Sequence, residues 1–100
     1  AASKYAMEIP YRVMQKSFES MEVMKAMAET GNPNSVSDAG VGALCARTAV
    51  RGAFMNVRIN ASGVEDKDFV NDLLEKGKTL EDKAAAMEQE IVKLVDEKIG

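Results

Sequence analysis

The sequence predicts an all-α protein, an antiparallel bundle of three helices that we expect to dimerise. Apolar residues recur at spacings of three and four over long stretches, which is the periodicity of an amphipathic helix. Two short segments rich in glycine, asparagine and serine interrupt these stretches and mark the turns between helices. No stretch alternates between apolar and polar residues as a half-buried strand does.

The first helix is predicted to begin at Pro10, because proline lacks the N–H group that an opening helical position leaves unpaired. Gly31 is predicted to end it, since glycine is common just past the last helical turn. The apolar stripe of this helix consists of Met7, Tyr11, Met14, Phe18 and Met21.

The middle helix is predicted to run from Asp38 to about Asn60, a length of roughly 33 Å. Ser35 to Asp38 matches the S-x-x-D pattern of a capping box at its start. Small and apolar residues cover most of its surface, so we expect other helices to pack around it. Two further helices are too few for this, which predicts either an oligomer or additional chain.

The third helix is predicted to start near Asp66, after the turn-like "NASG" of residues 60–63, and to run close to Ile99. Its charged residues, Glu81 and Glu88 among them, are typical of a solvated face. A seam of this length needs a partner helix, from this chain or from a second copy. The seam, with Gly77 as its weak spot, consists of Val70, Leu73, Leu80, Ala84, Met87, Ile91 and Leu94.

The composition excludes several classes of function. The formal net charge is −3, and no basic cluster marks a surface for nucleic acid or for a membrane. No apolar run reaches the roughly 18 residues of a transmembrane helix. The first residues lack the apolar core of a signal peptide, so we expect a cytoplasmic protein. Histidine is absent, so acid–base chemistry has to use carboxylates, lysine, tyrosine or water.

Three arginines of the middle helix, Arg47, Arg51 and Arg58, fall within an arc of about 40° at a helical step of about 100° per residue. Two interpretations stay open. The arginines extend to the edge of the core or pair with acidic residues of another helix. Alternatively, their guanidinium groups form an anion site for a carboxylate or a phosphate.

A polar strip lies on roughly the opposite side of the same helix, where Asp38, Asn56 and Asn60 surround small residues. This strip either leaves room for a ligand or makes a close helix contact. Cys45 lies within it and is expected to be a small core residue. The segment before the helix, residues 31–40, holds two asparagines and two serines, and such loops beside a helix N-terminus favour polar or anionic ligands.

The block "GNPNSVSDAGVGALCARTAVRGAFMNVRIN", residues 31–60, resembles the signature of the formiminotetrahydrofolate cyclodeaminase family. The resemblance extends through "EIPYRVM" at Glu8–Met14 and "DFVNDLL" at Asp68–Leu74. Family members are about twice as long, and their N-terminal half carries a glycine-rich "PTPGGGS"-like motif that this chain lacks. The resemblance therefore implies that residues 1–100 form the C-terminal half of a cyclodeaminase-type helical domain. It also implies a dimeric bundle and an acidic catalytic residue in the absent half.

The reaction implied by this resemblance is the closure of 5-formiminotetrahydrofolate to 5,10-methenyltetrahydrofolate, with release of ammonia. The substrate is a tetrahydrofolate derivative, and neither a metal nor a redox cofactor is implied. The expected partners are this small molecule, a second copy of the chain and the missing N-terminal half.

The family motif also suggests the residues of the site. Asp38 is assigned to acid–base or orienting work, although a capping role explains it almost as well. Hydrogen bonds to the pterin or to the formimino group are assigned to Asn32, Asn34, Ser35 and Ser37, with Asn56 and Asn60 in the same pocket. From spacing alone, Arg47 or Arg51 is assigned to the glutamate carboxylates of folate.

Two alternatives remain open at this point. One is methenyltetrahydrofolate cyclohydrolase, which belongs to the same family and adds water to the methenyl bridge. The other is a helical assembly module without catalytic activity, in which the apolar seam serves only for association.

Overall fold

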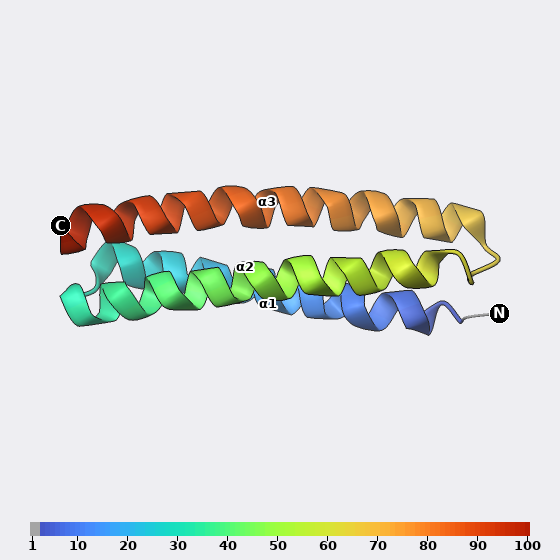
Figure 1. Ribbon diagram of the computed structural model, residues 1–100, viewed down its shortest axis with the longest axis horizontal. Coiled ribbons are helices and arrows are strands. Elements are labelled where there is room, and N and C mark those ends of the chain that lie inside the picture. Colours follow the sequence, from blue (N-terminus) through green and yellow to red (C-terminus); the bar gives the residue numbers. More distant parts are fainter. Residues whose placement is uncertain (1–2) are drawn as a thin grey trace.

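The computed structural model describes residues 3–100, and this part of the chain contains three helices and no strand. α1 spans Tyr5–Thr30, α2 spans Pro33–Ala61 and α3 spans Lys67–Ile99. The helices run in alternating directions along a rod of 51 × 16 × 16 Å (Figure 1). Each helix contacts both of the others. The predicted all-α antiparallel architecture is thus confirmed, while the dimer stays a prediction.

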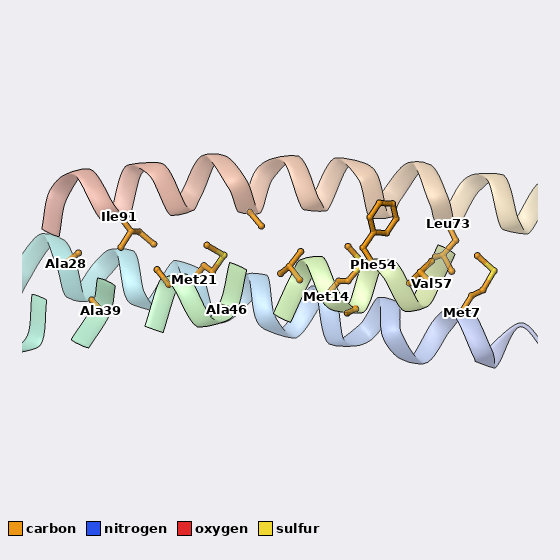
Figure 2. Packing of buried hydrophobic residues seen from close by; sticks show 14 of the residues in the cluster. Met7, Met14, Met21, Ala28, Ala39, Ala46, Phe54, Val57, Leu73 and Ile91 are labelled. Atoms are coloured by element: carbon orange, nitrogen blue, oxygen red, sulfur yellow. The ribbon is translucent and has the colours of Figure 1, made fainter. Parts of the chain in front are cut away.

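The core is built on a methionine stripe along α1. Met7, Met14 and Met21 recur at every seventh residue and are fully buried, and Ala28 continues the stripe. Figure 2 shows the three methionine side chains directed into the space between the helices. Tyr11 and Phe18 flank the stripe and are partly buried, which confirms the predicted apolar face of the first helix. Seven-residue spacing keeps these side chains on one line along the partner helices.

The predicted start of the first helix was wrong, because α1 begins at Tyr5 and encloses Pro10. Proline at this position removes a single hydrogen bond to the preceding turn. The first turn is held by N–H groups of Ala6 and Met7, which donate to the carbonyls of Ser3 and Lys4 at 3.0 Å each. Complete burial of Met7 gives a further reason for the helix to extend over this segment.

The predicted start of the middle helix was wrong as well, because α2 begins at Pro33. The N-cap is Asn32, whose side-chain oxygen accepts a hydrogen bond from the backbone N–H of Ser35 at 3.0 Å. Pro33 then takes the first helical position, where its missing N–H costs nothing. The capping box from Ser35 to Asp38 therefore does not exist. Only Gly31 and Asn32 connect α1 to α2.

Gly31 follows the last residue of α1, as predicted, but its backbone is extended, with φ −82° and ψ 163°. Any residue adopts this conformation, so another cause has to account for the glycine. A β-carbon at this position would lie 2.6 Å from the carbonyl oxygen of Met27 and 2.9 Å from the β-carbon of Ser35. The short connection leaves no room for a side chain, and glycine is needed for space.

The third helix agrees with its prediction at both ends. The side chain of Asp66 caps α3 by accepting a hydrogen bond from the N–H of Phe69 at 3.1 Å. Gly77, predicted as a weak spot, is a packing site: a β-carbon there would lie 2.5 Å from the ring atom Cε1 of Phe54. The remaining seam residues are buried (Val70, Leu73, Ala84 and Ile91) or partly buried (Leu80, Met87 and Leu94).

Only one side of α2 is covered by α1 and α3. On the other side Val41 is 60% exposed and Ile59 is 76% exposed, and Cys45 is exposed as well. The prediction that Cys45 is a core residue is therefore wrong for a single copy of the chain. The expectation that two helices are too few to surround α2 is confirmed. Within residues 3–100, no helix is long and apolar enough to cross a lipid bilayer.

Candidate functional site

The polar residues predicted to bind substrate begin at the N-terminus of α2. Asn34, Ser37 and Asp38 are exposed on its first two turns, and their side chains have no hydrogen-bond partner in the described part of the chain. Ser35 is partly buried, and the side chain of Asn32 is engaged in capping. Asn34, Ser37 and Asp38 are therefore available to a ligand, whereas the side chain of Asn32 caps the helix.

Asn56 and Asn60 lie at the opposite end of the same helix. The side-chain amide of Asn60 donates to the backbone carbonyl of Asn56 at 2.9 Å. Asp38 and Asn56 are separated by 18 residues, which corresponds to about 27 Å along a helix. One copy of the chain therefore does not bring these groups into a common pocket. The sequence pattern correctly predicted that these residues share one face of the helix. It did not show that opposite ends of a single straight helix stay far apart.

Two of the three arginines pair with carboxylates of α3. Nε of Arg47 lies 3.5 Å from a carboxylate oxygen of Glu88, and Arg51 is bonded to Glu81. Of the two interpretations that the sequence left open, pairing with another helix is the one that the structure shows for these residues. Arg58 differs, because its guanidinium lies over the ring of Phe54, 5.8 Å from the ring centre. No carboxylate of residues 3–100 is within ion-pair distance of Arg58.

Glu81 is the residue that the sequence analysis missed. It was assigned to the solvated face of the third helix, yet only 6% of it is exposed. Its position four residues after Gly77 and three before Ala84 places it in line with the apolar seam, and this spacing was the available signal. The guanidinium of Arg51 compensates the buried charge, so this ion pair joins α2 to α3.

A groove with a volume of about 530 Å³ runs between α2 and α3 next to this ion pair. Lys78, one of its cations, donates to Asp82 at 2.8 Å. Arg58 faces the same groove and is the cation without a carboxylate partner in the described chain. The groove is lined by Arg51, Phe54, Arg58, Leu74, Lys78 and Glu81.

Comparison with known proteins decides the family. The family model described as formiminotransferase-cyclodeaminase matches residues 1–79. This match contains α1, α2 and the first turns of α3, together with every predicted site residue. The chain belongs to the formiminotransferase-cyclodeaminase family. The resemblance inferred from residues 31–60 is thereby confirmed.

A curated relative of the chain gives a second comparison. The methenyltetrahydrofolate cyclohydrolase of Methylorubrum extorquens is 34% identical to the chain over 99 residues. The matched region is 99% of this chain and 48% of the relative. The chain thus spans about half the length of the curated relative it matches.

Proposed function

We propose that the chain forms part of an active site that closes 5-formiminotetrahydrofolate to 5,10-methenyltetrahydrofolate and releases ammonia. The observation that supports this proposal is the family match over residues 1–79. Within that match, three exposed polar side chains, those of Asn34, Ser37 and Asp38, are free to meet a ligand at the start of α2. These residues are the groups to which we assign the reacting end of the substrate.

The chemistry requires proton transfers at two nitrogen atoms and no change of oxidation state. The nitrogen on the aminobenzoate side of the folate attacks the formimino carbon, and a new carbon–nitrogen bond forms. The attacking nitrogen loses its proton, the imino nitrogen gains protons, and its bond to the one-carbon unit breaks as ammonia leaves. A carboxylate such as Asp38 can accept the first proton or orient the formimino group. Because ring closure is intramolecular, holding the two nitrogens close supplies much of the acceleration.

The tail of the folate presents a different requirement, since its glutamate carboxylates need cations. Arg47 and Arg51, assigned to this role from spacing, already bind Glu88 and Glu81. A tail carboxylate would have to compete with these groups, and at Arg51 it would leave the buried Glu81 without compensation. Arg58 has no such competitor within residues 3–100 and is therefore the cation of α2 that is free to bind a carboxylate.

A second candidate reaction is methenyltetrahydrofolate cyclohydrolase, and the observation that favours it is the name of the M. extorquens relative. In that reaction a water molecule attacks the same one-carbon centre, and the methenyl bridge opens. The same polar groups at the start of α2 would then orient water and take its proton. The two reactions differ in the leaving group, so the substrate that turns over distinguishes them.

The test offers 5-formiminotetrahydrofolate and 5,10-methenyltetrahydrofolate to the chain in separate assays. Formation or loss of the methenyl compound is followed by its near-ultraviolet absorbance, and ammonia is followed by a coupled assay. Binding of the methenyl compound is titrated in parallel. Asp38→Asn keeps the size of the side chain and removes its charge, while Glu22→Gln makes the same change at an exposed position of α1. Equal binding and turnover by the parent and Asp38→Asn would refute the assignment of Asp38.

A further inference from the structure

The groove between α2 and α3 contains an arginine whose charge no carboxylate of the described chain compensates. Three of the four arginines of the chain form ion pairs, namely Arg12, Arg47 and Arg51. Arg58 is the fourth, and within residues 3–100 no carboxylate lies within ion-pair distance of it. It lines the groove, so a positive charge faces this space without a counter-ion from these residues.

We propose that this groove binds a small monocarboxylate with an apolar, ring-sized body, and that the carboxylate bonds to Arg58. The inference goes beyond the proposed function, because it concerns a separate site. Arg58 follows Asp38 by 20 residues, which is about 30 Å along a helix. A folate whose reacting end is held at Asp38 does not bring its first glutamate to Arg58 of the same copy. The proposal is carried by the charge, the geometry, the lining and the size of the groove.

The charges of the groove favour a ligand with a single negative charge. Arg51 is compensated by Glu81, and Lys78 lies 2.8 Å from a carboxylate oxygen of Asp82. Of the three cations that line the groove, Arg58 is therefore the one left to balance a ligand. One carboxylate is sufficient for this. A phosphate dianion would bring a second negative charge close to the buried Glu81, where like charges repel.

Arg58 is also held in a restricted position. Its guanidinium lies over the ring of Phe54, 5.8 Å from the ring centre. Phe54 is itself fixed, because only 6% of it is exposed and its ring packs against Gly77 of α3. Figure 2 shows this side chain reaching from α2 toward α3. An arginine in contact with a ring keeps N–H donors for a carboxylate, and a restricted side chain loses less freedom on binding.

The body of the ligand finds apolar surface on both helices. Phe54 lines the groove from α2 and Leu74 lines it from α3. Leu74 is only partly buried, so a ring placed against it removes apolar area from water. An aromatic ring can in addition meet the edge of Phe54 in the arrangement that aromatic pairs prefer. The volume of about 530 Å³ lies within the usual range of small-molecule sites, about 300–1,000 Å³.

The class of ligand is tested with 2-naphthoate, an aromatic monocarboxylate. Its fluorescence can be followed because the chain contains no tryptophan. 2-Naphthamide has the same rings without the charge, and 2-naphthyl phosphate carries a second negative charge. 2-Naphthoate is expected to bind about tenfold or more tighter than either compound, since hydrogen bonds to a charged group are the strong ones. Equal affinity for the amide would overturn the role of the charge, and equal affinity for the phosphate would overturn the choice of a monoanion.

The role of Arg58 is tested with Arg58→Gln, which removes the charge from an exposed side chain. Arg12→Gln is the matched control. Arg12 also lies 5.8 Å from the centre of an aromatic ring, that of Tyr5, but it pairs with Glu8. Arg58→Gln is expected to weaken binding of 2-naphthoate by about tenfold or more, whereas Arg12→Gln leaves it unchanged. Circular dichroism checks the helix content of both variants. Equal binding by the two variants would overturn the proposal.

The position of the ligand is read from nuclear magnetic resonance signals of the four arginine Nε–H groups. On addition of 2-naphthoate, the signal of Arg58 is expected to shift, while those of Arg12 and Arg47 stay in place. Because Arg51 remains bonded to Glu81, its signal is expected to change less than that of Arg58. A shift confined to Arg51 would mean that the ligand displaces Glu81, and would overturn the assignment to Arg58.

A final titration separates this ligand from the folate of the proposed function. Binding of 2-naphthoate is measured again in the presence of saturating 5,10-methenyltetrahydrofolate. Its affinity is expected to be unchanged, because Arg58 is remote from Asp38. Competition would make the groove part of the folate site and would overturn a separate ligand. A chain that binds 2-naphthoate but no folate would support the groove site and count against the proposed function.

Discussion

The contact between Gly77 and Phe54 leads to a quantitative prediction for Gly77→Ala. Alanine is normally better than glycine inside a helix, by about 1 kcal/mol. Here the new β-carbon would lie 2.5 Å from Cε1 and 2.8 Å from Cδ1 of the Phe54 ring, so the ring or α3 has to move. Overpacking of this kind costs about 1–3 kcal/mol. We therefore expect a net loss of about 1 kcal/mol in the free energy of unfolding.

The assay is urea unfolding followed by far-ultraviolet circular dichroism, at one protein concentration for all variants because association shifts the apparent stability. The matched background is Phe54→Leu, which removes the ring from the contact. In that background Gly77→Ala is expected to become stabilising by up to about 1 kcal/mol, since only the helix preference remains. A double-mutant cycle isolates the steric coupling. The packing argument fails if Gly77→Ala stabilises the native Phe54 protein or has the same effect in both backgrounds.

Three further predictions concern caps and charges. Asn32→Ala should lower the free energy of unfolding by about 1 kcal/mol through loss of the α2 cap, while Asp38→Ala should change it little. If urea unfolding gave the larger loss for Asp38→Ala, the capping box from Ser35 to Asp38 would be the true cap of α2. Arg51→Ala should destabilise the protein by about 1–2 kcal/mol, a value reduced because Arg51 is half exposed; Arg51→Met combined with Glu81→Leu should recover most of the loss in the same assay. The hydrogen bond from the N–H of Phe69, followed by the nearby Lys4, lowers the pKa of Asp66 below its ordinary value of 3.8. The folded state thus favours the charged carboxylate, so its contribution to stability is present above pH 3.8 and is lost as the pH falls through the lowered pKa. The melting temperature of Asp66→Ala should accordingly lie below that of the parent at neutral pH and converge with it in acid; a gap independent of pH would contradict this.

Most of the fold could be predicted from local patterns. The apolar stripe of α1, the break at Gly31 and the start of α3 near Asp66 are each determined by a few neighbouring residues, and all three are confirmed. The start of α2 was missed because two valid start signals lie three residues apart. Asn32 followed by Pro33 and the pattern from Ser35 to Asp38 are both reasonable N-termini. The earlier one prevails, and it adds a further turn and the burial of Val36 to the helix.

The candidate site was predictable only in part. The family and the segment that carries the polar residues follow from the sequence, because the block of residues 31–60 is specific. The pairing of Arg51 with Glu81 and the role of Gly77 were not predictable from periodicity, since both depend on which residue of another helix lies opposite. The distance between Asp38 and Asn56 follows from helix geometry alone. It already excludes a common pocket within one copy of the chain, contrary to the prediction.

The burial of the methionine stripe of α1 also determines how the protein responds to oxidation. Thioethers are converted to sulfoxides by peroxide at a rate that depends on solvent access. Met55 is half exposed on α2, whereas Met7, Met14 and Met21 are fully enclosed by the bundle. Met55 should therefore react first, and the three enclosed sulfurs should react only when α1 separates from its neighbours. Because a sulfoxide is too polar for the space it would have to re-enter, each such event would hold the bundle open and turn a transient opening into lasting damage.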